Sequence, residues 1–257
     1  MNLCTSWIIS WKFLSEPVAA GQVGGHEGVG IVAQMGPFSD SSGVKIGDRV
    51  GIKWIAYACG NCAPCLAGAD DLWLHIAGTF QQFVLAPAHY VTPIPEGLSS
   101  EMAAPLLCGG GTVYSALKKS KAQSGDWVSG PAASAKVLAA TGGEGAAAVV
   151  VCSGNNAAYA QGLDFLKFNG ILVGVGVPGD LQPIENACPH LMVSKQLAIV
   201  GSTVGNRRDA IETLNMAQRV VSTSFKLENV QSLDRIFGEM KDGQLQGRVV
   251  LDLQTWA

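Results

Sequence analysis

The 257-residue chain has little charge: Asp, Glu, Lys and Arg together make up 14% of it, and the formal net charge is −3. It contains no basic run or stripe of the kind that binds phosphate backbones, so nucleic acid is not an expected partner. No apolar run approaches the roughly 20 residues that a membrane-spanning helix needs, so a membrane is not expected either. The hydrophobic content of 48% is typical of a globular protein with a substantial core.

Residues 1–15 are rich in large apolar side chains, and a secretory signal peptide has to be considered there. No basic residue precedes the apolar stretch and Lys12 interrupts it, so the pattern does not match a signal peptide. The chain has 7 cysteines, an odd number, and some of them are clustered. Without an export signal, clustered cysteines favour metal binding over disulfides, and a cytoplasmic location is expected.

The first part of the chain has a strand-like pattern. Over residues 30–93, short apolar stretches alternate with glycine and proline, which predicts a small antiparallel β-barrel. The candidate strands are residues 31–33, 52–55 and 80–85.

After Pro95 the pattern changes to helices that alternate with continuous apolar runs. Ser99 and Ser100 mark a helix start, and helical patterns follow at 112–121 and 157–168. The apolar runs predict buried strands at residues 146–152, 170–177 and 196–201, which is typical of a parallel sheet with covered faces. The end of the chain predicts helices at 207–221 and 232–241 and a strand at 248–251.

Three cysteines stand at the spacing Cys59-x-x-Cys62-x-x-Cys65. Three thiols on one loop can face a single metal ion, and zinc in a closed structural site takes four such ligands. An iron–sulfur cluster would need a further cysteine near position 69, where the chain has Ala69. Three loop cysteines without a metal remain an open alternative.

Two further groups of residues are weak evidence for a functional site when each is taken alone. His26 and Glu27 stand side by side between glycines, and Cys108 precedes a run of glycines. A His–Glu pair in such a place is most often a turn with a surface acid. A lone cysteine before glycines is most often a small buried residue.

Together with neighbouring segments, these groups resemble the zinc-dependent, medium-chain alcohol dehydrogenase family, above all its yeast-type and fungal branch. The matching segments keep the family's order: GGHEGVG (24–30), KIGDRVGIKW (45–54), ACGNCAPCLAG (58–68), GTFQQF (78–83), APLLCGGGTVYSALK (104–118), GSTVGNR (201–207) and GRVVLD (247–252). The resemblance implies an α/β plus β fold. A GroES-like β-barrel catalytic domain would occupy residues 1–105 and a reduced Rossmann-type dinucleotide-binding domain residues 106–205, and residues 206–257 would return to the catalytic domain.

The resemblance also implies roles for individual residues. His26 and Cys108 would bind a catalytic zinc, with Cys4 as the candidate for the remaining cysteine ligand and Glu27 beside them as an alternating or supporting ligand. Ser6 would relay a proton. The three clustered cysteines, Cys59, Cys62 and Cys65, match three of the four ligands of a structural zinc. The implied cofactor contacts are Val173, Gly174, Val175, Ser202, Thr203, Val204 and Arg248.

The implied reaction is reversible oxidation of a small-molecule alcohol to an aldehyde with NAD or NADP as the second cofactor. Zinc acts as a Lewis acid that lowers the pKa of the bound alcohol, and the protein brings hydride donor and acceptor together. A zinc-free enoyl or quinone reductase of the same superfamily fits poorly, because His26 and Cys108 would then have no role.

The sequence departs from the family at several positions. The slot of the fourth structural ligand falls at Trp73, where Asp70, Asp71 or His75 are the possible substitutes. The family's Asp and His that follow the catalytic cysteine align with Trp7 and Ile9, so the proton relay is incomplete.

The largest departure is in the dinucleotide domain. The stretch 125–133 begins the family's first strand and turn, but no G-x-G-x-x-G follows, and Ser134 opens a segment that resembles a much later helix. The acidic residue that would bind the ribose has no counterpart. A second interpretation is therefore a truncated, catalytically inactive relative that lacks the pyrophosphate loop. The reduced sheet would also leave an open edge, which favours a homo-oligomer.

Overall fold

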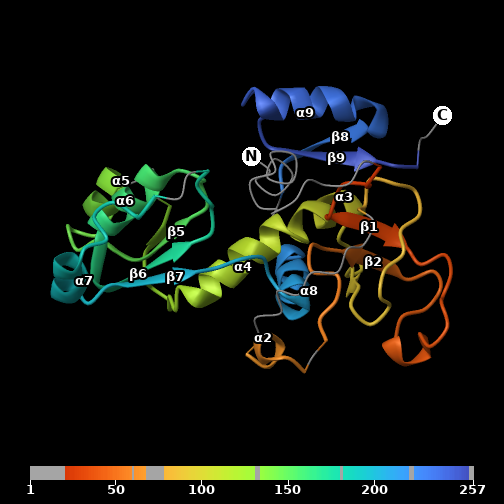
Figure 1. Ribbon diagram of the computed structural model, residues 1–257, viewed down its shortest axis with the longest axis horizontal. Helices are drawn as coiled ribbons and strands as arrows, with labels where there is room; N and C mark the ends of the chain where they lie inside the picture. The colour runs from red at the N-terminus through yellow and green to blue at the C-terminus, as the bar shows by residue number, and fades with distance from the viewer. Residues whose placement is uncertain are drawn as a thin grey trace. The chain divides into compact units, whose positions relative to one another are not determined.

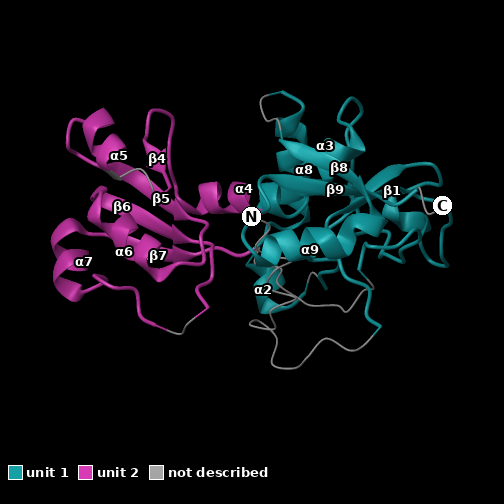
Figure 2. Ribbon diagram, turned by 90° about the horizontal axis from the view of Figure 1, so that it is seen from above, with its two compact units in different colours: residues 1–111, 204–257 teal, residues 112–203 magenta. Residues whose placement is uncertain are grey.

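The computed structural model describes residues 21–59, 61–67, 78–130, 134–179, 182–219 and 223–254, and Figure 1 labels most of its helices and strands. The chain forms two compact units, which Figure 2 colours separately. Unit 1 comprises residues 1–111 and 204–257, and unit 2 comprises residues 112–203. Helix α4 (Gly109–Lys119) carries the chain from the first unit into the second.

Unit 1 contains two small sheets. The first is antiparallel with the order β1-β2-β3, and β1 pairs with β2 from Gly28 opposite Ile52 to Ile31 opposite Arg49. In the second sheet, β8 and β9 are parallel. The strand bounds are Gly28–Ile31 (β1), Arg49–Ile52 (β2), Thr92–Pro93 (β3), Phe225–Asn229 (β8) and Arg248–Asp252 (β9).

Three strand predictions in this region were wrong. Strand β1 ends at Ile31, where the predicted strand 31–33 begins. Strand β2 begins at Arg49, ahead of the predicted residues 52–55, because Gly47 at φ 92° completes the turn early and the chain pairs with β1 from there. Residues 80–85 form no strand, and the side chains of Phe83 and Leu85 are 79% and 88% exposed. Their apolar alternation finds no partner strand in the described part of unit 1.

Three helices of unit 1, α3, η2 and α8, contribute to one apolar cluster. Helix α8 places Leu214 and Ala217 in this cluster, on the face that its periodicity predicts, and a capping box between Asn206 and Asp209 fixes its start. The rest of the cluster is Ile94, Leu98, Ala103, Leu106 and Leu107. The helices are η1 (Asp40–Ser42), α2 (Ala63–Leu66), α3 (Ser100–Ala103), η2 (Ala104–Leu106), α8 (Arg207–Ala217), η4 (Val230–Ser232) and α9 (Leu233–Lys241).

Unit 2 is a four-stranded parallel sheet with the order β4-β5-β6-β7, the same as the order along the chain. Its strands are β4 (Val128–Ser129), β5 (Ala146–Val151), β6 (Leu166–Gly174) and β7 (Ala198–Gly201), connected through α5 (Ser134–Ala140), α6 (Asn156–Asp164) and α7 (Pro189–Lys195).

The apolar runs at 146–152 and 170–177 form the buried centre of the sheet that they predict, whereas the run at 196–201 forms the edge strand β7, where Ile199 is 36% exposed. Val149, Val151 and Leu172 are fully buried and pack with Tyr159 and Leu163 of α6 in the core cluster of this unit. Ala148 and Val173 point to the opposite face of the sheet and are also fully buried. Both faces of the sheet are therefore covered at its centre, as predicted.

The boundary between α6 and β6 differs from the prediction. Helix α6 ends at Asp164, not at residue 168, and β6 runs over residues 166–174 and not 170–177. The register of β6 against β5 shifts between Ala146 and Ala148, and Asn169 has a positive φ of 59°. This bulge lets one strand pair in two stretches, which a continuous apolar run does not reveal. Among the residues that the structure describes, no helix has the length and apolar character required to cross a lipid bilayer.

Candidate metal centres and cofactor contacts

An imidazole, a carboxylate and a thiol from distant parts of the sequence meet in unit 1. One ligand atom each from His26, Glu27 and Cys108 lies within 4.8 Å of the other two. His26 and Cys108 are buried, with 8% and 2% of their surfaces exposed, and Glu27 is partly buried. The structure thus brings together the candidate ligands His26, Glu27 and Cys108. The other two candidates at this centre, Cys4 and Ser6, lie outside the described residues.

Backbone pairing between two glycine-containing segments positions His26. Residues 78–80 donate backbone hydrogen bonds to the carbonyls of residues 23–25 over 2.9–3.1 Å. A Cβ atom on Gly78 would lie only 2.0 Å from the Gly24 carbonyl oxygen, so the segments can approach this closely only with glycine at position 78. His26 directly follows this paired segment, and β1 begins two residues later.

His26 carries polar atoms that the protein itself leaves unsatisfied. Neither Nδ1 nor Nε2 has a hydrogen-bond partner within the described part of the chain, although both are buried. The ring packs edge-on against Trp54, with 4.9 Å between the centroids. Leaving a buried polar group unpaired is unfavourable by about 1–3 kcal/mol. A metal ion between His26 and Cys108 would remove this penalty at one nitrogen, so the residues present fit a zinc ion.

The carboxylate of Glu27 is held by two other groups of unit 1. Its Oε1 accepts a hydrogen bond from the Gly109 backbone N–H at 3.1 Å, and Nη1 of Arg248 lies 3.8 Å from the same oxygen. The guanidinium also fills the space beside Gly109, where an added Cβ would lie 2.3 Å from Nη2. These contacts join the start of α4 and the start of β9 to the His26 segment.

Glu27→Gln is expected to weaken metal binding at this centre by about 10–100-fold, as is usual when a group that supports metal ligands is altered. The amide keeps a hydrogen-bond acceptor for Gly109 but removes the negative charge beside Arg248 and the metal. Competition with a chromophoric zinc chelator measures the change. An unchanged zinc affinity would contradict the role given to this carboxylate.

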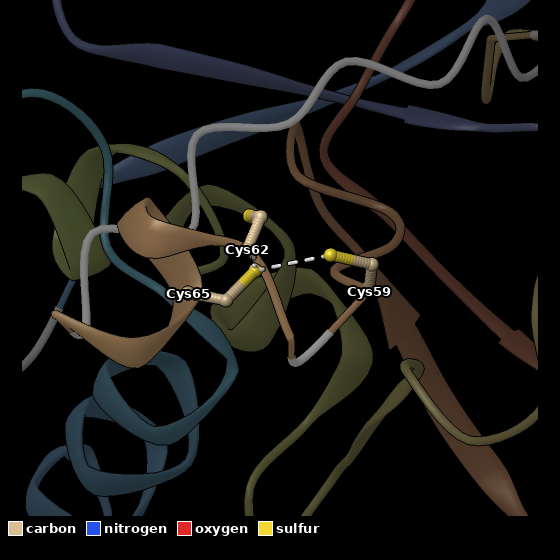
Figure 3. A group of neighbouring side chains, drawn as sticks. All are labelled: Cys59, Cys62 and Cys65. Atoms are coloured by element: carbon tan, nitrogen blue, oxygen red, sulfur yellow. Dashed lines mark hydrogen bonds between the residues drawn. The ribbon is translucent and has the colours of Figure 1, made fainter.

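The second metal candidate is the cysteine cluster shown in Figure 3. The sulfur atoms of Cys62 and Cys65 lie 3.3 Å apart, those of Cys59 and Cys65 lie 3.8 Å apart, and all of them lie within 4.8 Å of one another. Cys62 precedes the short helix α2, which turns Cys65 back toward it. Backbone hydrogen bonds, first from Asn61 and then from Cys62, lower the pKa of the Cys59 thiol to about 7. Converging thiols with thiolate character at neutral pH fit a zinc ion.

The fourth ligand of this cluster is not assigned. Its slot at Trp73 and the possible substitutes Asp70, Asp71 and His75 lie outside the described residues. Within the described part of the chain, the cluster therefore offers three ligand atoms.

Cys62→Ser is expected to weaken metal binding at the cluster by more than about 100-fold, because it removes a ligand itself and not only a group supporting one. The thiolate-to-metal absorption of the cobalt-substituted protein reports this loss. Cys188→Ser, which changes an exposed free cysteine in unit 2, is the matched control and is expected to keep the full band. Equal bands in both variants would show that the cluster binds no metal.

The proposed cofactor residues cluster at the carboxyl ends of two neighbouring strands. Val173 and Gly174 end β6, and Ser202 follows β7 and donates its N–H to the Gly174 carbonyl at 2.8 Å. Val175 and Thr203 are the next residues along the chain at these two strand ends. Val204 and Arg248 belong to unit 1.

Sequence reasoning gave no role to Trp54 and Gly109, although both contact the His26–Glu27 pair. Each lies within a segment that matched the family, but no spacing rule marks either residue as a neighbour of His26. Only the folded chain shows these contacts.

Comparison with known proteins places this site in a family. The model of the alcohol dehydrogenase GroES-like domain matches residues 4–96, and that of the zinc-binding dehydrogenases matches residues 116–219. Alcohol dehydrogenase 2 of Emericella nidulans is 44% identical to the chain, covering 95% of the chain and 84% of its own length. The chain belongs to the zinc-binding alcohol dehydrogenase family. The family assignment made from the motifs is therefore confirmed.

Other relatives agree with this family. An alcohol dehydrogenase of Schizosaccharomyces pombe is 32% identical, covering 90% of the chain and 81% of its own length. The crystal structure of the alcohol dehydrogenase from Aeropyrum pernix aligns with a TM-score of 0.78 at 22% identity, over 94% of this chain and 86% of that one. This structural likeness confirms the predicted GroES-like and Rossmann-type fold.

The alcohol dehydrogenase family also implies an oxidoreductase that uses zinc and NAD or NADP, as predicted. The comparisons favour this interpretation over that of an inactive relative. The alignment with the Emericella protein spans 309 positions, more than the 257 residues of this chain, so that relative has internal segments without a counterpart here.

The fit of a dinucleotide to unit 2 is incomplete. A pyrophosphate is held by a glycine-rich turn at the start of a helix. Between β4 and α5 the chain has only Gly130-Pro131-Ala132-Ala133, and proline has no N–H to donate. These residues do not fit a pyrophosphate group.

Proposed function

We propose that this alcohol dehydrogenase catalyses the reversible, zinc-dependent transfer of a hydride between an alcohol and NAD(P), with unit 1 as the catalytic domain and unit 2 as the cofactor domain. The alcohol loses a hydride to the oxidised cofactor and a proton to solvent. The main support for the proposal is that ligand atoms of His26, Glu27 and Cys108 lie close together, where both buried ring nitrogens of His26 have no hydrogen-bond partner among the described residues.

We assign the catalytic zinc to His26 and Cys108, with Cys4 as the third ligand. Two cysteines and a histidine leave one position open for substrate, as in other catalytic zinc sites. A zinc ion held there supplies a Lewis acid that lowers the pKa of a bound alcohol. His26 would hold the ion through a ring nitrogen and Cys108 through its sulfur, and both side chains are buried.

Glu27 and Ser6 take supporting roles in this proposal. The contacts of Glu27 with the Gly109 N–H and Arg248 hold its carboxylate beside the zinc ligands. The carboxylate would have to leave these partners in order to enter the metal's coordination shell, so it acts as an alternating ligand. The hydroxyl of Ser6 carries the alcohol proton away.

A hollow of about 1500 Å³ in unit 1 is lined by His26 and Glu27 and by apolar side chains that include Phe80, Phe237 and Leu245. Its volume exceeds the roughly 300–1,000 Å³ of common small-molecule sites. Such a wall favours alcohols with an apolar tail over small polar ones. This lining supports an aliphatic or aromatic alcohol as the substrate class.

The test is zinc-dependent reduction of NAD or NADP by a series of primary alcohols of increasing chain length. We expect activity that rises with the apolar tail, disappears on treatment with a chelator and returns on addition of zinc. Turnover that persists after the zinc has been removed would overturn the proposal.

Two further proposals concern the setting of the protein. The cysteines that the structure describes form no disulfide, which supports a reducing compartment such as the cytoplasm. Strand β4 pairs only with β5 in the described part of unit 2, and an open edge supports self-association as a homo-oligomer. Size-exclusion chromatography with light scattering tests the second of these.

A further inference from the structure

We infer that this chain recognises its cofactor through the nicotinamide mononucleotide half alone, so that the adenylate half adds little to binding. The inference rests on the proposed function, because it concerns the cofactor of that reaction. It predicts a dehydrogenase that does not distinguish NAD from NADP and also accepts a nicotinamide mononucleotide.

The strand order of the sheet in unit 2 is the first observation behind this inference. A dinucleotide-binding sheet consists of two mononucleotide-binding halves that meet at the first strand, with the strand order 3-2-1-4-5-6. Unit 2 has the order β4-β5-β6-β7, all parallel. Strand β4 lies within the GDWVSG segment (125–130), which resembles the first strand, and the three strands on one side of it form a complete half. On its other side, the described chain provides no strand that could form the adenosine half.

The connection between β4 and α5 is the second observation behind this inference. In a complete fold this turn donates backbone N–H groups to the pyrophosphate, and an acidic residue about 20 positions later binds the ribose of the adenosine. Here the residues between β4 and α5 include Pro131, which has no N–H, and only one glycine. About 20 positions after this turn the chain enters the apolar end of β5, at Val150 and Val151. The sequence of the adenylate half thus lacks the glycine-rich turn that presents phosphate donors and the acidic residue that binds the ribose.

The half assigned to the nicotinamide mononucleotide, by contrast, is closely packed. The Tyr159 hydroxyl donates a hydrogen bond to the Gly176 carbonyl, and the Gly176 N–H donates to the Val151 carbonyl at 2.8 Å. A Cβ on Gly176 would lie 2.3 Å from the Ser153 carbonyl oxygen, and one on Gly154 would lie 2.8 Å from that of Val177. The loops after β5 and β6 therefore pack closely against each other at their glycines, at the carboxyl ends of these strands.

A buried hydroxyl at this end lacks a partner. Ser202 directly follows β7 and is 7% exposed, and its Oγ has no hydrogen-bond partner within the described residues. A hydroxyl both donates and accepts, so it can satisfy one side of a carboxamide. The nicotinamide ring carries such a carboxamide. In the proposed complex, this carboxamide is the partner of the unpaired Oγ.

The inference predicts an unusual order of affinities. NADH, NADPH and reduced nicotinamide mononucleotide are expected to bind within about 3-fold of one another, because their differences lie in the half that finds no partners. In a site that holds the adenylate half, reduced nicotinamide mononucleotide would lose two charge-assisted hydrogen bonds that NADH makes. That loss alone would make its affinity about 100-fold or more weaker than that of NADH. ADP-ribose is expected not to compete with any of them.

The experiment is equilibrium titration of the zinc-loaded, full-length chain with each of the three reduced ligands, followed by quenching of tryptophan fluorescence, and with ADP-ribose as the competitor. Affinities within about 3-fold and no competition are the expected result. Binding of NADH at least about 30-fold tighter than that of the mononucleotide, or displacement by ADP-ribose, would overturn the inference and leave the proposed function intact. If none of the three binds, the inference is also overturned, and alcohol-dependent activity then decides separately on the proposed function.

Ser202→Ala tests the assigned contact. We expect all three ligands to bind about 5–10-fold more weakly, by the same factor, since the lost hydrogen bond lies in the part they share. Ser194→Ala is the matched control, because this exposed hydroxyl on α7 bonds only to the Leu191 carbonyl of its own helix. Equal affinities in the two variants would show that Ser202 does not contact the nicotinamide half.

Discussion

Cys108→Ser is expected to lower the rate of alcohol oxidation at least about 1000-fold. Sγ of Cys108 is a buried ligand atom within 4.8 Å of those of His26 and Glu27, and a serine hydroxyl binds zinc far more weakly than a thiolate. A Lewis acid contributes several kcal/mol to the stabilisation of the transition state, and a loss of about 4 kcal/mol corresponds to a 1000-fold lower rate. Zinc content and turnover are measured on the same preparation.

The control for this variant is Cys188→Ser, which removes an exposed thiol remote in sequence from the metal ligands. It should keep both zinc and activity. Because serine is smaller and can be accommodated at a buried position, the thermal unfolding midpoint of Cys108→Ser should stay close to that of the metal-free wild type. A Cys108→Ser protein that retains its zinc and its rate would show that the His26 centre is not where the reaction takes place.

The sequence predicted which residues of the candidate site meet better than it predicted the structure that supports them. His26 and Cys108 are far apart in the chain, yet the order of the matched segments was enough to predict that they meet, because a family fold fixes which segments are neighbours. The continuous apolar run of β5 likewise predicted a parallel sheet, because a strand covered on both faces is apolar throughout.

The strand predictions failed where backbone hydrogen bonds between residues far apart in the sequence determine the structure. Residues 80–85 alternate like a strand but form none, while residues 78–80 pair with residues 23–25, a stretch with two glycines and no periodicity. The bulge at Asn169 likewise depends on the register against β5. Side-chain patterns carry no information about such pairings, since the groups that pair are the same in every residue.

The importance of that unpredicted pairing can be measured with Gly78→Ala. A Cβ at this position would lie 2.0 Å from the Gly24 oxygen and 2.4 Å from the Val23 oxygen, both of them backbone atoms that cannot rotate away. The two segments must separate, which breaks the hydrogen bonds that residues 78–80 donate to residues 23–25. We expect a loss of about 3 kcal/mol or more in the free energy of unfolding, the upper end of the range for overpacking, as measured by denaturant titration.

The same variant tests whether the pairing positions the metal ligand. His26 directly follows the displaced segment, so zinc affinity at the His26–Cys108 centre should fall at least about tenfold, which is a modest loss for a ligand moved out of its coordination geometry. Gly36→Ala is the matched control, because a Cβ at Gly36 meets no atom within 4 Å and the residue has no positive φ. It should change the free energy of unfolding by less than about 1 kcal/mol and leave zinc binding unaltered. If Gly78→Ala loses stability but binds zinc as tightly as the wild type, then Trp54 and the start of β1 are sufficient to hold His26, and the pairing serves stability alone.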